Sequence, residues 1–143
     1  MHELVSRALF TEQTKGIERV ARLRGWTIYC IEYPAIDVGF IGESKDIRVR
    51  MLCCDWDEMP PSIELLSLAG ERLSTIRTGP DSVFNNSAHP VTGYPFICMI
   101  GTREYHIHPS HTSDHWDNHK NKPGNDLGGI LTQVWNAWLK IQG

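Results

Sequence analysis

The sequence predicts an α+β fold with an antiparallel sheet, and three observations predict it. Apolar residues recur at helical spacing near both ends of the chain. Between these ends, strand-like runs follow one another without an intervening helical segment, which is typical of a meander. The length of 143 residues, with 41% hydrophobic and 22% charged residues, fits one core. We therefore expect residues 1–143 to form a single domain with an N-terminal helix, a four-stranded antiparallel meander, a long loop and a C-terminal helix.

The predicted N-terminal helix extends to about Arg24. Its apolar residues recur at near-helical spacing, with charged residues between them: Ile17, Val20, Ala21 and Leu23. Glycine is common just past the C-terminus of a helix, so Gly25 is expected to end it.

Four strand-like runs follow the helix. They cover residues 26–33, 35–42, 46–53 and 62–70. The first run is rich in β-branched and aromatic residues, which favour strands. The third alternates apolar and basic residues from Ile47 to Met51, the pattern of a half-buried strand.

Residues 75–96 form an irregular stretch with several turn signals, among them Asn85-Asn86 and His89-Pro90. A loop of this length within a compact domain is uncommon and is often functional. After a second breaker-rich stretch at 117–126, apolar residues recur at spacings of three and four from Leu127 onward. This pattern predicts the C-terminal helix, with one apolar face against the core.

Composition and charge argue against several kinds of partner. The net charge is −3 and the basic residues are scattered, so no nucleic-acid partner is expected. No run approaches the ~18 apolar residues that would span a bilayer, and the charged N-terminus does not look like a signal peptide. We therefore expect a cytoplasmic protein with no membrane partner and with reduced cysteines. Cys30, Cys53 and Cys54 lie among strand-like apolar residues and are expected in the core.

Between Cys98 and His119 the sequence concentrates side chains that bind metals. They are Cys98, Glu104, His106, His108, His111, His115 and His119. Thiolate, carboxylate and imidazole are ligands that zinc accepts. We expect a zinc site built from Cys98, Glu104, His106, His108 and His111. Asp114 and Asp117 could orient the imidazoles.

A hairpin with a three-residue turn beginning at Gly101 would bring this set together. Cys98 would then lie opposite His106, and Glu104 and His108 would share their face, because side chains alternate along a strand. Directly opposed side chains lie ~5 Å apart, which is a usable distance for shared ligation. The predicted zinc site depends on this turn, because a turn one residue shorter would scatter the set.

The order of elements and motifs resembles the ubiquitin-conjugating (E2, or UBC) fold over nearly the whole chain. The stretch DWDEMPPSIELLS is similar to the corner between that family's third and fourth strands. His89-Pro90 is similar to the start of its His-Pro-Asn tripeptide, and the segment with Cys98 to the strand that carries its acceptor cysteine. The helix from Leu127 is similar to the helix after the active site. The resemblance implies a UBC-like fold in which the long loop is an active-site loop.

The same resemblance implies roles for individual residues. Cys98 would be the nucleophile that accepts a ubiquitin-like C-terminus as a thioester. His89 would shape the loop rather than act as a base. Val91 stands where the family has the asparagine implied in oxyanion stabilisation, so Asn85 or Asn86 could supply that amide.

The histidine-rich run is similar to a second group, the bacterial predicted metal-binding proteins named for Cys, Glu, His and His (CEHH). These proteins are encoded beside bacterial ubiquitin-like proteins, E1-like activating enzymes, E2-like enzymes and JAB-type peptidases. Cys98 and Glu104 match the first two positions, and two of the following histidines would fill the others. The resemblance implies a ubiquitin-like protein and an E1-like enzyme as partners.

The sequence thus predicts an E2-like component of a bacterial ubiquitin-like protein conjugation pathway. Cys98 would be either the thioester acceptor or part of a Cys/Glu/His metal site, since one thiolate cannot do both at once. One alternative is a non-catalytic, metal-binding accessory or binding module for the ubiquitin-like protein or its E1. Three tryptophans could anchor such a surface, although tryptophans at helical spacing are more often part of a core: Trp116, Trp135 and Trp138. A further alternative is a metal-dependent hydrolase with Glu104 as base, although no HExxH motif accompanies it.

Overall fold

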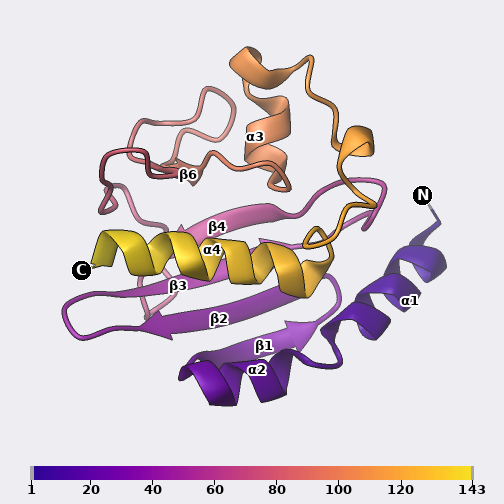
Figure 1. Ribbon diagram of the computed structural model, residues 1–143, viewed down its shortest axis with the longest axis horizontal. Coiled ribbons are helices and arrows are strands. Elements are labelled where there is room, and N and C mark those ends of the chain that lie inside the picture. The colour runs from indigo at the N-terminus through magenta and orange to yellow at the C-terminus, as the bar shows by residue number, and fades with distance from the viewer. Residues whose placement is uncertain (1, 143) are drawn as a thin grey trace.

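The computed structural model describes residues 2–142 and has the α+β architecture that the sequence predicts (Figure 1). Its helices are α1 (Glu3–Thr14), α2 (Ile17–Arg24), α3 (Arg103–Ile107) and α4 (Leu127–Gln142), with 3-10 turns η1 (Pro109–His111) and η2 (Trp116–Asn118). Its strands are β1 (Thr27–Glu32), β2 (Ala35–Ile41), β3 (Asp46–Leu52), β4 (Ser62–Leu66), β5 (Phe84–Asn85) and β6 (Phe96–Ile97). Within the described range, no helix combines the length and the apolar character needed to cross a bilayer.

The main sheet has the order β1-β2-β3-β4 with every neighbour antiparallel, so the predicted meander is confirmed. Val38 lies opposite Val49, and Met51 lies opposite Ile63, and all four side chains are buried. The predicted alternation is present in β3, where Arg48 and Arg50 lie on the face of the sheet opposite to the buried side chains of Val49 and Met51. β4 ends earlier than predicted, at Leu66, because the chain then makes a turn in which the Gly70 N–H donates to the Ser67 carbonyl.

The N-terminal segment forms two helices rather than the single predicted one. The break falls at Gly16, which has no side chain and is a poor residue for a helix interior. With this break, Phe10 of α1 and Ile17 of α2 both lie in the core. Gly25 ends α2 in the left-handed conformation, with φ of 73°, as predicted.

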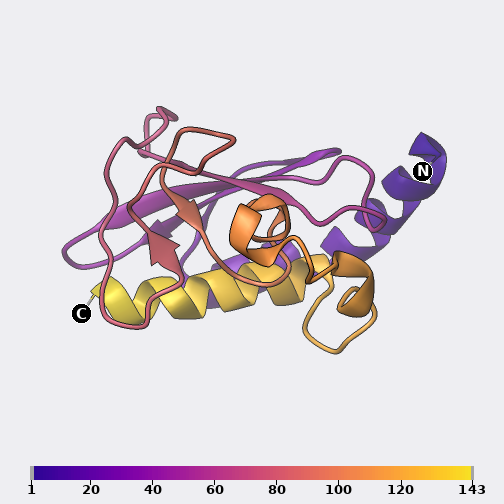
Figure 2. The same ribbon diagram turned by 90° about the horizontal axis from the view of Figure 1, so that it is seen from above.

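Helix α4 covers one face of the sheet as a second layer (Figure 2). The ring of Trp138 lies 5.7 Å from that of Phe40 on β2, and Trp135 lies 5.8 Å from Trp26. Trp116 is buried as well. These tryptophans pack in or against the core, so they do not form an open anchoring surface for a binding module.

The long loop folds back on itself before it reaches the chemistry-bearing segment. Its strand β5 pairs with β6, with Phe84 opposite Ile97 and Asn85 opposite Phe96. Phe84, Phe96 and Ile97 are buried. This small ladder fixes the position of the residues that follow β6, beginning with Cys98.

The three cysteines outside this segment occupy different environments. Cys53, at the end of β3, is buried as expected, and Cys30 is half-buried. The expectation for Cys54 is wrong, because it is exposed at the start of the turn after β3. All four cysteines of the chain are free thiols.

Candidate functional site

Cys98 lies directly after β6, beside an open cleft. Its N–H donates to the Val83 carbonyl at 2.7 Å, which extends the β5-β6 ladder by one bond. The cleft has a volume of about 600 Å³ and is lined by residues 82–87, Thr78 and Cys98. The thiol is half-buried, and this burial raises its pKa. The resting group is therefore a neutral thiol at the edge of a mostly polar cleft.

His89 is a buried structural residue that joins the loop to α3. Its Nδ1 accepts the Val91 N–H at 3.0 Å, which leaves the ring proton on Nε2. Nε2 lies 2.8 Å from the Glu104 carbonyl oxygen and donates to it. Both ring nitrogens are therefore engaged in hydrogen bonds to the backbone. These two bonds connect the loop at Val91 to helix α3.

The predicted hairpin at Gly101 is wrong, because the chain forms helix α3 at this point. Gly101 adopts the left-handed conformation, with φ of 99°. The Thr102 hydroxyl then accepts the Tyr105 N–H and caps the helix. Because a helix turns by about 100° per residue, Glu104, His106 and His108 do not share one strand face. Thr102, a favoured N-cap residue, is followed two positions later by Glu104 in the first turn, and this was a helix-start signal in the sequence.

Glu104 is a buried structural residue and does not face an open site. Its carboxylate is buried at the junction of α3 and β4. One oxygen accepts the Ser62 hydroxyl at 2.6 Å, and the other accepts the Ile63 N–H at 2.8 Å. Glu104 is therefore neither placed as a metal ligand nor available as a base for water.

Asp114 organises three of the neighbouring rings, and we call this group the Asp114 hub: Asp114, Tyr105, His106 and His119. Its carboxylate accepts the Tyr105 hydroxyl at 2.7 Å and the His119 Nε2–H at 2.7 Å. Its backbone carbonyl accepts the His106 Nδ1–H at 2.8 Å. The expectation that Asp114 orients imidazoles therefore agrees with the structure, while Asp117 lies 3.6 Å from Lys120 instead.

The hub changes the ionisation of its members. The hydrogen bonds from His119 and then from Tyr105 lower the pKa of Asp114. The same hydrogen bond to Asp114 raises the pKa of Tyr105 to about 12. Burial lowers the pKa of His106, whose Nε2 accepts the Gly101 N–H at 3.2 Å. His106 is thus held neutral, with both nitrogens used by the backbone.

The remaining histidines differ in their contacts, and one of them lies against Cys98. His108 accepts the Ser110 N–H at 3.1 Å and caps η1, and its ring stacks on Phe96. His115 is exposed. His111 lies against the thiol, with its Nε2 3.5 Å from the Cys98 Sγ.

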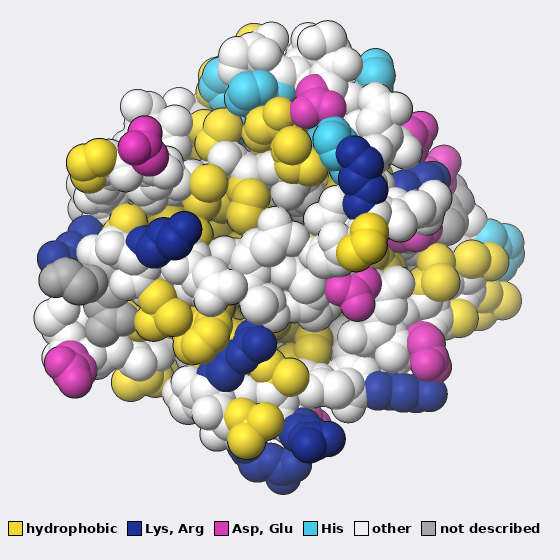
Figure 3. Space-filling model, in the orientation of Figure 1, with side chains coloured by type: hydrophobic (Ala, Val, Ile, Leu, Met, Phe, Trp, Pro, Cys, Tyr) yellow, Lys and Arg dark blue, Asp and Glu magenta, His cyan; other side chains and the backbone are white. Residues whose placement is uncertain are grey.

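The predicted zinc ligands are therefore not assembled as a metal centre. Histidine side chains do gather on the α3 end of the molecule (Figure 3). Yet across residues 2–142 no three His, Cys, Asp or Glu side chains lie close enough together to hold one metal ion. Of the predicted set, the structure brings Cys98 and His111 together, and the ring centroid of His108 lies 5.9 Å from that of His111. Glu104 and His106 make other contacts. The residues present do not fit a zinc site in this arrangement.

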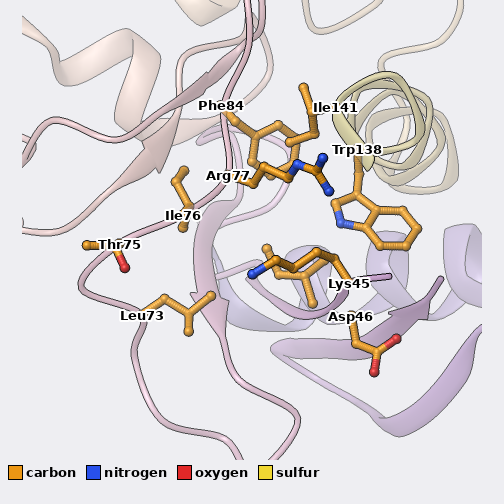
Figure 4. A pocket seen from close by; sticks show the side chains of 10 residues that line it. Lys45, Asp46, Leu73, Thr75, Ile76, Arg77, Phe84, Trp138 and Ile141 are labelled. Carbon is orange, nitrogen blue, oxygen red and sulfur yellow. The ribbon is translucent and has the colours of Figure 1, made fainter. Parts of the chain in front are cut away.

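A separate small pocket lies between the start of β3, residues 73–77 and α4 (Figure 4). Its volume is about 130 Å³, and its lining includes the rings of Phe84 and Trp138 together with Lys45. Neither Cys98 nor any histidine lines it. The pocket is therefore distinct from the cleft at Cys98.

A comparison with known protein families concerns the part of the chain that carries this site. Residues 79–141 match the model of the Y4jH-like family, described as the Y4jH family. The chain is also similar to uncharacterized protein y4jH of Sinorhizobium fredii (strain NBRC 101917 / NGR234), at 38% identity over 47 residues. This alignment covers 33% of the chain and 23% of that relative, so the chain spans about a quarter of the relative's length. The family match runs from the long loop through Cys98 and the Asp114 hub into α4.

Proposed function

We propose that this protein is an E2-like component of a bacterial ubiquitin-like protein conjugation pathway, in which Cys98 accepts the C-terminus of the ubiquitin-like protein as a thioester. The observation that carries the proposal is the position of Cys98 beside an open cleft, directly after the small β5-β6 ladder. A thioester carrier needs a thiol that a large acyl donor can reach. The meander and the order of motifs around it support a UBC-like frame.

The cleft offers donors for the oxygen that becomes negative when the thiol attacks. Asn85 and Asn86 both line it. The Asn86 side-chain oxygen accepts the Ile76 N–H at 2.7 Å, and that of Asn85 accepts the Ser87 N–H at 2.8 Å. Since each amide oxygen is used within the loop, the NH₂ end of each side chain is the part that can donate to an oxyanion.

His89 supports this chemistry indirectly. Its two bonds tie the loop at Val91 to the carbonyl of Glu104 in α3. In the proposal it keeps the loop in place beside the cleft and takes no proton.

The alternatives have less support from the same residues. Zinc in proteins takes four ligands, and the thiol of Cys98 has a single imidazole against it, that of His111. Glu104, the base of the hydrolase alternative, has both carboxylate oxygens occupied by β4. A non-catalytic module that binds the ubiquitin-like protein or its E1 would need no reactive thiol, so the test is whether Cys98 forms an adduct.

The experiment combines the protein with ATP, a bacterial ubiquitin-like protein and the E1-like enzyme that activates it. We expect an adduct that resists denaturation but is cleaved by a thiol reductant, as a thioester is. Cys98→Ala should abolish it. Cys54→Ala is the matched control, since Cys54 is an exposed thiol away from the cleft, and it should leave the adduct intact.

Two results would contradict the proposal. An adduct that survives in Cys98→Ala would assign the acceptor to another residue. Binding of the ubiquitin-like protein without any thiol-sensitive adduct, in the presence of active E1, would favour the non-catalytic module.

A further inference from the structure

The imidazole of His111 lies against the thiol of Cys98, a contact that the proposed function leaves without a role. The two residues are 13 positions apart in the sequence, and the His111 Nε2 lies 3.5 Å from the Cys98 Sγ. This is within the range of a hydrogen bond that involves sulfur. Apart from Cys98, the cleft is lined by Ser, Thr, Asn, Val and Phe side chains, none of which can take a proton from a thiol. His111 is therefore the base that the structure places beside Cys98.

The ring of His111 also packs against the ring of Tyr105. The two rings are stacked, with centroids 4.1 Å apart and an angle of 15° between their planes. The Tyr105 hydroxyl is fixed by the carboxylate of Asp114 at 2.7 Å, and Asp114 is fixed in turn by His119. The Asp114 hub thus anchors the surface on which His111 rests.

We propose that His111 is the proton acceptor for Cys98 during acyl transfer, and that Tyr105 is a positioning residue that holds His111 at the thiol. The proposal rests on the proposed function, because the same sulfur would accept the acyl group. Proton transfer by a positioned base contributes about 10²- to 10⁴-fold to a rate.

The step balances without any further reactant. The Cys98 sulfur attacks the carbonyl carbon of an activated acyl group, and the S–H proton passes to the His111 Nε2. The tetrahedral intermediate then collapses, the bond from carbon to the leaving group breaks, and the imidazolium returns its proton to that leaving group. The products are acyl-Cys98, the free leaving group and neutral His111.

Two features of the site favour transfer of the Cys98 proton to His111 while the sulfur attacks the acyl carbon. The burial that raises the pKa of Cys98 keeps the thiol protonated at rest, so the reaction needs a base at that moment. The imidazolium that forms stays over the face of Tyr105, and a cation is attracted to an aromatic face.

A small activated ester tests this pair without any protein partner. The full-length protein is incubated with p-nitrophenyl acetate and quenched at intervals, and acetylation of each cysteine is followed by mass spectrometry of its peptides. Cys54, which is exposed, serves as an internal reference in the same tube. Cys53, which is buried, reports unfolding if it becomes acetylated.

The key variant is His111→Asn, with His111→Gln as a second form of the same change. We expect acetylation at Cys98 to slow by about 100-fold or more while Cys54 reacts as before. The matched control is His115→Asn, because His115 is an exposed histidine of the same segment, and it should leave both rates unchanged. Unchanged acetylation of Cys98 in both His111 variants, with Cys53 still protected, would overturn the base assignment.

Tyr105 is tested by a pair of variants that separate its ring from its hydroxyl. Tyr105→Phe keeps the aromatic face and should retain most of the rate at Cys98. Tyr105→Leu removes that face and should slow Cys98 by about 10-fold, since small displacements of a catalytic group cost up to about 10² in rate. In proton NMR the ring signals of His111 should lie upfield in the parent and in Tyr105→Phe, and move downfield in Tyr105→Leu. An undiminished rate in Tyr105→Leu would overturn the positioning role.

The two proposals can fail separately. If His111→Asn slows ester acylation but no thioester forms with E1 and the ubiquitin-like protein, the assignment of His111 as the base for Cys98 is supported and the conjugation function is contradicted. If the thioester forms and ester acylation of Cys98 does not depend on His111, the conjugation function is supported and the assignment of His111 as the base is contradicted.

Discussion

The carboxylate of Glu104 accepts the hydroxyl of Ser62 at 2.6 Å and so joins helix α3 to the first residue of β4. Its second oxygen accepts the N–H of Ile63 at 2.8 Å. The Glu104 side chain is buried, so the bond from Ile63 is shielded from water and the bond from Ser62 partly so. Hydrogen bonds to a charged acceptor are stronger than neutral ones. A carboxylate in a histidine-rich segment thus fixes the platform from which the neighbouring rings project.

We expect Glu104→Ala to lower the free energy of unfolding by about 2–3 kcal/mol, because it leaves a buried N–H and a hydroxyl without their acceptor. Urea unfolding followed by circular dichroism measures this. Glu43→Ala, at an exposed glutamate, is the control and should change stability by less than about 0.5 kcal/mol. Equal stabilities of the two variants would mean that the Glu104 bonds add nothing to the fold.

Gly101 should not tolerate a side chain. Its φ of 99° is unfavourable for other residues, and an added Cβ would lie 3.3 Å from the Ile130 Cγ1. We expect Gly101→Ala to cost more than about 1 kcal/mol of unfolding free energy and to disturb the start of α3. Gly16→Ala is the matched control, since its φ is −91° and no atom lies within 4 Å of the added carbon. A Gly101→Ala protein as stable as Gly16→Ala would contradict this account of the turn.

Stability should fall as the pH drops below about 6.5, in part because of His106. Burial lowers its pKa in the folded protein, so below the unfolded value of about 6.5 the unfolded chain binds the proton first. The loss continues until the pH reaches the folded pKa. Its slope cannot exceed about 1.4 kcal/mol per pH unit because a single proton is bound, and the partial exposure of the ring reduces the effect further. Asp114 affects stability in a lower pH range. Because its pKa is lowered in the folded protein, its contribution to stability is lost only as the pH falls below about 4.

The measurement is the urea midpoint between pH 5 and 8 for the parent and for His106→Asn. We expect the variant to be less stable at pH 8 and to show a shallower decline toward pH 5. Parallel curves would show that His106 does not couple folding to pH in this range.

Zinc should not be a structural component of the protein. The described residues offer no group of three suitable side chains, and Glu104 and His106 are already bonded elsewhere. We expect elemental analysis of the purified protein to find far less than one metal per chain, and EDTA to leave the unfolding midpoint unchanged. About one zinc per chain that disappears in Cys98→Ala would instead establish the Cys98 metal site.

The sequence determined much of the scaffold. The alternation from Ile47 to Met51 and the apolar spacing from Leu127 are local patterns, and local patterns fix which face of a strand or helix is buried. For this reason the meander and the C-terminal helix could be read from residues alone. The sequence also singled out Cys98 and the loop with His89.

The tertiary structure decided what the histidines do. Seven residues with similar ligand chemistry look equivalent in the sequence, but Glu104 faces β4, His106 faces Asp114 and His111 faces Cys98. The capping of α3 by Thr102 set these directions, because a helix sends successive side chains around its axis where a hairpin would have aligned them. Which partner each polar group finds depends on segments brought together by folding, and no local spacing specifies that.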